Sequence, residues 1–186
     1  MKKYSFSSIF TEAFRDNLGW EKAWAKRKPK KEYEIIIVGG GGHGLATAYY
    51  LAKNYNVTDI AVIEKGWIGG GNTGRNTTII RSNYLQESSI GIYEKSRFLY
   101  ETLSQDLNYN IMFSPRGVLM LCQTEHELRA MKRTSHANRI NGVDTKMVTP
   151  DEVKEIVPII NIEGPRFPVL GALWQPRGGT ARHDAV

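Results

Sequence analysis

The feature that most constrains the fold is a run of glycines between an apolar segment and a segment with helical spacing. Gly39 to Gly44 follow the β-branched segment 33–38 (YEIIIV) and precede 45–54 (LATAYYLAKN). A continuous apolar run of this kind is typical of a strand covered on both faces. The segment 60–63 (IAVI) predicts a second strand. The order strand, helix, strand over residues 33–64 predicts a parallel α/β unit of the Rossmann type.

Three of these glycines have the spacing Gly-x-Gly-x-x-Gly, which is typical of dinucleotide-binding turns. Gly39 allows a tight turn, Gly41 lets a pyrophosphate approach the backbone, and Gly44 lets helix and strand pack closely. Glu64, at the end of the second strand, is placed to accept hydrogen bonds from ribose hydroxyls and would repel the 2′-phosphate of NADP. A glycine-rich turn without a ligand is the alternative. The turn residues expected to bind the cofactor are Gly39, Gly41, Gly42, His43 and Gly44.

A second polar, glycine-rich loop, residues 69–76 (GGGNTGRN), follows soon after Glu64. An NAD site has no general need for such a loop, whereas a flavin extends past the first helix and needs further polar contacts. A surface loop without a ligand is the alternative. The residues expected to bind FAD in this region are Glu64, Lys65, Gly71, Asn72, Thr73, Arg75 and Asn76.

Four segments resemble a known family. They are 35–54 (IIIVGGGGHGLATAYYLAKN), 61–85 (AVIEKGWIGGGNTGRNTTIIRSNYL), 113–119 (FSPRGVL) and 175–186 (QPRGGTARHDAV). They resemble the beta subunits of heterotetrameric sarcosine oxidases, within the amino-acid-oxidase-like family of FAD-dependent oxidoreductases. The resemblance extends from about residue 33 to residue 186. It implies an α/β fold, with a Rossmann-type FAD-binding domain and the start of an inserted α+β substrate domain.

The resemblance also implies a reaction, two cofactors and partners. Sarcosine would be oxidised to glycine on non-covalent FAD, and electrons would pass through FMN to oxygen, giving hydrogen peroxide. His183 matches the histidine that carries FMN covalently in the family, and a neutral imidazole has a free ring nitrogen for such a bond. Without the resemblance, His183 is a surface histidine. The implied partners are a small-molecule amine and the alpha and other subunits of a hetero-oligomer.

Arg81 is the candidate catalytic residue, because in related flavoenzymes the segment around it passes the flavin ring. A cation there would stabilise the reduced, anionic flavin. An arginine on a helix surface or facing another subunit is the alternative. No pair of histidines has metal-ligand spacing, so we expect no metal site. Cys122, in an apolar segment, is expected to be a buried structural thiol.

The net charge of +6 is concentrated in a basic N-terminal arm, residues 1–31, which has nine Lys and Arg against three acids. Such an arm can bind nucleic acid, a membrane surface or an acidic partner. No nucleic-acid-binding fold accompanies it, so we favour an arm lying on residues 32–186 or on a neighbouring subunit. There is no apolar run long enough for a membrane span and no signal peptide, so we expect a cytoplasmic protein.

The C-terminal segment 180–186 (TARHDAV) has the composition of a helix start with no stop signal after it. Only two parallel strands precede it, which is few for a sheet of this class. We therefore expect the N-terminal part of a longer protein, with an FAD domain that is incomplete at the C-terminus. Two other functions stay open: a related FAD-dependent proline, glycine or dimethylglycine dehydrogenase subunit, or an inactive truncated fragment.

Overall fold

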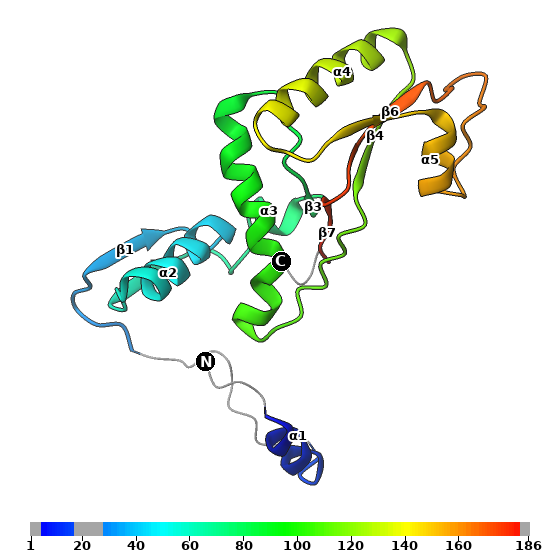
Figure 1. Ribbon diagram of the computed structural model, residues 1–186. Helices are drawn as coiled ribbons and strands as arrows, with labels where there is room; N and C mark the ends of the chain where they lie inside the picture. Colours follow the sequence, from blue (N-terminus) through cyan, green and yellow to red (C-terminus); the bar gives the residue numbers. More distant parts are fainter. Residues whose placement is uncertain (1–4, 17–27, 183–186) are drawn as a thin grey trace. The chain divides into compact units, whose positions relative to one another are not determined.

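The computed structural model describes residues 5–16 and 28–182, and the chain divides into two compact units, residues 1–76 and 77–185. Figure 1 shows the elements of both. The first unit contains α1 (Phe6–Ala13), β1 (Ile35–Val38), α2 (Gly42–Tyr55), β2 (Ile60–Ile63) and the short 3₁₀ helix η1 (Thr73–Arg75). The second contains β3 (Ile79–Ile80), α3 (Glu87–Leu107), β4 (Val118–Cys122), α4 (Glu125–Ile140), β5 (Lys146–Val148), α5 (Pro150–Ile156), β6 (Gly171–Gln175) and β7 (Gly179–Thr180).

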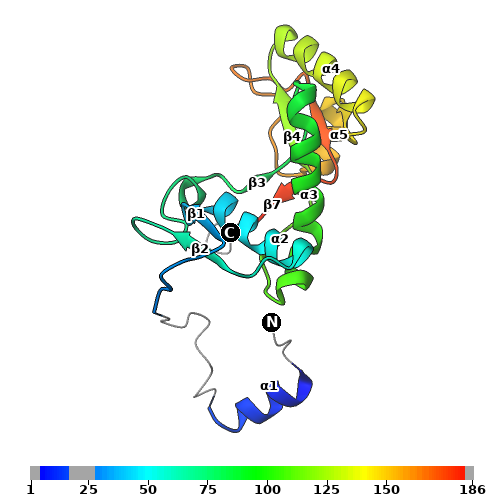
Figure 2. The ribbon, with the colours of Figure 1, turned by 90° about the vertical axis from the view of Figure 1, so that its left-hand side faces the viewer.

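The strand–helix–strand unit predicted for residues 33–64 is confirmed. β1 and β2 are parallel, with Ile35 opposite Ile60 and Val38 opposite Ile63. Figure 2 shows the two strands side by side with α2 next to them, and α2 contacts both. The helix ends at Asn56, whose left-handed backbone (φ 57°) stops it, as asparagine often does at this position.

The expectation that residues 33–38 form a strand covered on both faces is wrong for the part of the chain that the structure describes. Burial alternates along β1, and the side chains of Ile36 and Val38 are 56% and 85% exposed. Successive side chains of a strand point to opposite faces, so α2 covers one face and the other is open. A continuous apolar run indicates that both faces are suited to burial, but it does not supply the second covering layer.

The basic arm contains a helix that its charge pattern does not predict. The Ser5 hydroxyl accepts a hydrogen bond from the Ser8 amide (3.1 Å) and caps α1. Phe6, Phe10 and Phe14 recur every four residues, and their rings are in contact along one side of the helix. All three rings are exposed.

The second unit is built on an antiparallel sheet of three strands in the order β4-β6-β5. In Figure 1, α4 lies along this sheet, and it contacts all three strands. The helix α5 contacts the central strand β6. The core next to α5 consists of four buried residues, Val148, Val153, Val169 and Ala172.

Local sequence signals explain where α4 and α5 begin. The predicted capping box is present: the Thr124 hydroxyl accepts from the Glu127 amide (3.2 Å), and the Glu127 carboxylate accepts from the Thr124 amide (3.1 Å). Thr149 and Glu152 form a second capping box at the start of α5, where Pro150 occupies the first turn.

The two ends of the second unit pair with each other in β3 and β7. Ile79 lies opposite Thr180, and Ile80 lies opposite Gly179. The Ala181 amide donates to the Thr78 carbonyl (3.0 Å) and extends the pairing. The expectation that a helix begins at Thr180 is therefore wrong at that residue, because its backbone is engaged in a strand. Residues 183–186 lie outside the described part.

Candidate functional site

The glycine turn between β1 and α2 has the backbone geometry that its residues predict. Gly39 has φ +110°, a region that side chains other than hydrogen rarely allow. Its amide donates to the carbonyl of Ile63 (2.7 Å), so the turn stays attached to the end of β2. A Cβ added to Gly44 would lie 2.0 Å from the Gly39 carbonyl oxygen. Helix and strand can approach this closely only because Gly44 has no side chain.

The N-terminus of α2 is open toward the turn. Gly41 is the N-cap residue, has an extended backbone and supplies no side-chain hydrogen bond to the helix. The first amides of a helix have no acceptor inside it and carry a partial positive charge. In this turn the Gly42 amide donates to the Thr73 hydroxyl (2.9 Å). His43, in the first turn, is exposed. The glycines of the turn therefore place no side chains over the start of α2, and the Thr73 hydroxyl lies at the Gly42 amide.

Glu64 connects this turn to the end of β2. Its Oε2 accepts from the Gly40 amide and its Oε1 from the Gly66 amide, both at 2.8 Å. These two bonds lower the pKa of Glu64, and the bond from Gly40 has the larger effect. The carboxylate is therefore ionised at neutral pH. An ionised carboxylate has about four acceptor positions, so Glu64 can still accept bonds from a ligand.

The loop 69–76 folds back onto the glycine turn. The Gly69 amide donates to the Gly40 carbonyl (2.9 Å), and the Thr73 hydroxyl accepts from Gly42 as described above. A Cβ on Gly74 would lie 2.7 Å from the Gly69 carbonyl oxygen, so the loop needs glycine there. The structure thus brings together the turn, Glu64 and Thr73, which are separated by up to about 30 residues in sequence.

The other predicted residues of this region lie at its surface. Asn72 precedes η1, and the Asn76 side-chain amide donates to the Thr73 carbonyl. No neighbouring atom lies within 4 Å of a Cβ built on Gly71. The exposed residues of the set are Lys65, Gly71, Asn72, Arg75 and Asn76.

Arg81 belongs to the second unit and follows β3 directly. Its Nη1 donates to the Asn83 side-chain oxygen (2.8 Å), and its guanidinium lies over the ring of Tyr84, 4.3 Å from the centroid. Tyr84 in turn stacks on Tyr93 of α3 (centroids 4.1 Å apart). Arg81 is partly buried and is held in a cation–π contact rather than extended into solvent.

The predictions for His183 and Cys122 have different outcomes. His183, the candidate FMN attachment residue, lies outside the described residues. Cys122 has an exposed fraction of 0%, and burial raises the pKa of its thiol, so the prediction of a buried structural cysteine is confirmed. Within residues 5–16 and 28–182 there is no cluster of side chains that could hold a metal ion. The helices in that part of the chain are also too short or too polar to cross a bilayer.

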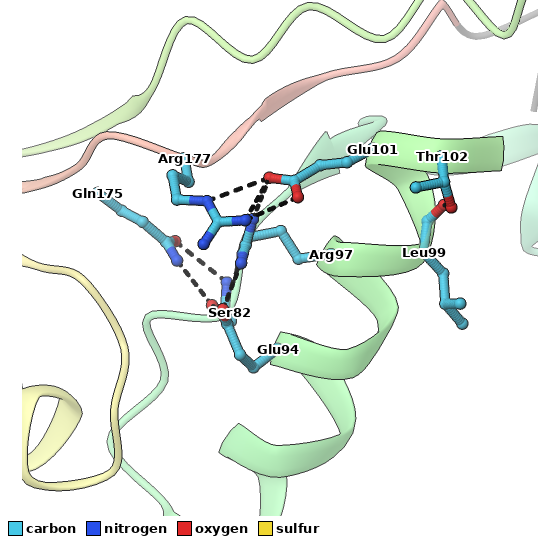
Figure 3. A network of polar contacts seen from close by, with 8 residues as sticks. All are labelled: Ser82, Glu94, Arg97, Leu99, Glu101, Thr102, Gln175 and Arg177. Carbon is cyan, nitrogen blue, oxygen red and sulfur yellow. Dashed lines mark hydrogen bonds and ion pairs between the residues drawn. The ribbon is translucent and has the colours of Figure 1, made fainter. Parts of the chain in front are cut away.

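Sequence reasoning missed a polar network in the second unit. Glu94, Arg97 and Glu101 share one side of α3, and Figure 3 shows them together with Ser82, Gln175 and Arg177. Arg97 is 2% exposed. The spacing of three and four residues between acid and base along the helix was the available signal, because such residues are neighbours on a helix surface.

Comparisons with known proteins identify relatives along most of the chain. The model of the family "FAD dependent oxidoreductase" matches residues 34–186. The chain is 66% identical over 186 residues to the sarcosine oxidase subunit beta of Rhodobacter capsulatus, covering 100% of this chain and 45% of that protein. It is 58% identical over 167 residues to the protein of the same name from Arthrobacter sp., covering 89% of this chain and 41% of that protein. The chain thus spans about half the length of these curated relatives.

A solved structure is similar in fold as well as in sequence. The crystal structure of L-proline dehydrogenase from P. horikoshii superposes with a TM-score of 0.73 and 34% sequence identity. The superposition covers 83% of this chain and 39% of that chain.

Proposed function

The chain belongs to the FAD dependent oxidoreductase family, and we propose that its first unit binds the pyrophosphate and ribose of FAD in a flavin amine oxidase. The observation that carries the proposal is the convergence of three features at the start of α2. They are the glycine turn, the ionised carboxylate of Glu64 and the Thr73 hydroxyl. Backbone donors suit phosphate oxygens, and a carboxylate beside them suits ribose hydroxyls.

The residues present fit this cofactor. The place where a Gly44 side chain would point is filled by the Gly39 carbonyl, and Gly41 adds no side chain over the start of α2. Thr73 contacts the Gly42 amide, so its hydroxyl is close enough to share in binding a phosphate oxygen. The residues that would hold FAD are Gly39, Gly41, Gly42, His43, Gly44, Glu64, Lys65, Gly71, Asn72, Thr73, Arg75 and Asn76.

When bound, FAD supplies the two-electron oxidation of a C–H bond next to an amine nitrogen. For Arg81 we propose an electrostatic role: its guanidinium would stabilise negative charge on the reduced cofactor. Its contacts with Asn83 and Tyr84 fix the position of that charge.

The substrate and the partners are proposed from the names of the relatives. Two relatives of 66% and 58% identity are named sarcosine oxidase subunit beta, so we propose sarcosine as the amine and further subunits as partners. We further propose that residues 1–31 form an arm and that residues 32–186 begin the FAD domain, with an inserted substrate domain. The sequence around His183 supports covalent FMN, which would pass electrons to oxygen and give hydrogen peroxide.

A dehydrogenase is the second candidate. It is favoured by the 34% identity to a solved L-proline dehydrogenase, which is high enough to concern more than the fold. Such an enzyme would use the same FAD site but would pass its electrons to an acceptor other than oxygen.

The test uses the full-length protein produced together with its partner subunits. Sarcosine, proline and dimethylglycine are added anaerobically, and loss of the flavin absorbance near 450 nm reports reduction; oxygen uptake and peroxide are then measured. Reduction by sarcosine with peroxide formation supports the oxidase. Reduction without oxygen uptake supports the dehydrogenase, and a protein that retains no flavin refutes both.

Acid precipitation separates the two cofactors. A yellow pellet that becomes colourless in His183→Ala, with FAD in the supernatant of both proteins, supports covalent FMN at His183. Complete release of flavin from the unmodified protein refutes the FMN proposal and leaves the FAD site unaffected.

A further inference from the structure

Six polar side chains of the second unit form a closed ring of contacts, which Figure 3 shows in part as dashed lines. Gln175 bonds twice to Ser82: its Oε1 accepts from the Ser82 amide (3.1 Å), and its Nε2 donates to the Ser82 hydroxyl (2.6 Å). The Ser82 hydroxyl donates to Glu94, and Arg97 Nε donates to Glu94 Oε2 (3.0 Å). The ring therefore links the segment after β3 to α3 and to the end of β6.

The second half of the ring returns to the end of β6. Arg97 Nη1 donates to Glu101 Oε1 (2.6 Å), and Arg177 Nη2 donates to Glu101 Oε2 (2.7 Å). Arg177 is two residues after Gln175, so the ring closes through the main chain. The negative charges of the two carboxylates balance the positive charges of the two guanidiniums. A buried charge needs such partners, so this balance allows Arg97 to be buried.

The ionisation states agree with this balance. The hydrogen bond from Arg97 lowers the pKa of Glu94 and outweighs the opposing effect of burial. Burial opposes the ionisation of Glu101, but the hydrogen bonds from Arg177 and Arg97 outweigh it and lower the pKa of that carboxyl as well. Both carboxyl groups are therefore ionised at neutral pH.

Other elements hold the same segment from further sides. The Asn138 side-chain amide of α4 donates to the Tyr84 carbonyl, and the Asn83 side-chain amide contacts the sulfur of Met120 on β4 (3.3 Å). Ser82 and Asn83 are 0% and 2% exposed. Residues 82–84 have no regular secondary structure, yet side chains from α3, α4, β4 and β6 fix them.

This fixed segment carries Arg81. The guanidinium of Arg81 bonds to the Asn83 side chain and lies over the Tyr84 ring, so its position depends on the backbone of residues 82–84. If Gln175 no longer held Ser82, the residue next to Arg81 would lose one main-chain and one side-chain hydrogen bond, and the guanidinium would lose its fixed support.

We propose that Gln175 and Glu94 are positioning residues, which hold Ser82 and thereby fix the guanidinium of Arg81 for its electrostatic role. The proposal rests on the role proposed above for Arg81. A buried ion pair can be replaced by apolar side chains of similar volume at little cost in stability. The experiment must therefore detect an effect on the position of the Arg81 guanidinium that is separate from any effect on the stability of the protein.

The experiment measures anaerobic flavin reduction in the full-length complex. Gln175→Met keeps the length of the side chain and removes both bonds to Ser82. We expect its limiting reduction rate to fall about tenfold, while the apparent substrate Kd stays within about twofold, since displacements of about 1 Å at a reacting centre have effects of this size or larger. In an Arg81→Ala background, Gln175→Met should slow reduction no further.

The matched control is Val153→Ala, which opens a cavity in the core next to α5. It should lower the melting temperature and leave the reduction rate unchanged, which separates positioning from general destabilisation. If Gln175→Met cannot be purified, Glu94→Gln replaces it; this variant keeps the side-chain shape and removes the charge pair with Arg97. The same slow reduction is expected.

The outcomes separate this proposal from the one on which it rests. If Arg81→Ala reduces flavin at the normal rate, the role of Arg81 fails and the positioning proposal fails with it. If Arg81→Ala is slow but Gln175→Met is normal, or if the two effects multiply in the double variant, the role of Arg81 stands and positioning by Gln175 is refuted.

Discussion

The Gly44→Ala substitution tests the proposed FAD site through one backbone contact. The added Cβ would lie 2.0 Å from the Gly39 carbonyl oxygen, whereas real Cβ atoms essentially never come within 3.0 Å of such an atom. The start of α2 must therefore move about 1 Å away from β1. The obstacle is main chain rather than a side chain, so it cannot rotate aside.

The magnitude follows from two opposing effects. Overpacking of this kind costs about 1–3 kcal/mol. Alanine is preferred over glycine within a helix by about 1 kcal/mol, which offsets part of that cost. We expect a net destabilisation of about 0–2 kcal/mol. At the middle of this range, about 1 kcal/mol, FAD binding should weaken by about fivefold, since 1.4 kcal/mol corresponds to a factor of ten.

The assay is the fraction of FAD retained after gel filtration of the full-length protein, together with its melting temperature. Gly91→Ala is the matched control, because Gly91 lies on α3 outside the proposed FAD site and a Cβ there would meet no atom within 4 Å. It should retain FAD normally. A Gly44→Ala protein with normal FAD content and an unchanged melting temperature would refute the close-packing argument and weaken the case for the site.

Three further predictions concern stability and reactivity. Gly91→Ala, at an exposed position of α3 with open space around a Cβ, should raise the free energy of unfolding by about 0.5–1 kcal/mol in urea denaturation. The Thr149 amide holds the pKa of Glu152 below its usual 4.5, so the stabilisation by this carboxylate is complete above that pH and is lost as the pH falls through the lower, folded-state pKa. The melting temperature of Glu152→Gln should therefore fall less than that of the unmodified protein between about pH 5 and pH 3, and equal slopes would contradict this. Cys122, buried and with a raised pKa, should resist a thiol reagent such as DTNB in the native protein and react fully in denaturant, whereas rapid native reaction would show that β4 opens.

The elements that were predictable from sequence are those fixed by neighbours in the chain. The turn at Gly39 and Gly44 follows from the absence of a Cβ, and the start of α4 follows from the reciprocal bonds of Thr124 and Glu127. These signals lie within a few residues of the feature that they specify. The continuous apolar segment IAVI, bounded by Asp59 and Glu64, predicted β2 at its observed bounds for the same reason.

The remaining features depend on residues that are distant in sequence. The contact between Thr73 and Gly42 joins positions 31 residues apart, and the bonds between Ser82 and Gln175 join positions 93 apart. Spacing along the chain carries no information about such pairs. The exposure of β1 shows another limit of sequence patterns. Its apolar sequence predicts that both faces are buried, but the described residues cover only one of them.

The pairing of β3 with β7 has a consequence for how the second unit forms. Bringing Ile79 to Thr180 closes a loop of about 100 residues, and the entropy of that closure costs about 4 kcal/mol for a flexible chain. Two residue pairs cannot meet such a cost alone, so these strands should join only after the sheet β4-β6-β5 and its helices have shortened the effective loop. Once joined, they fix the start and the finish of the unit to each other. Each doubling of loop length adds only about 0.6 kcal/mol to the cost of closure. The segment between β3 and β7 can therefore lengthen or shorten in related chains while the two strands stay paired.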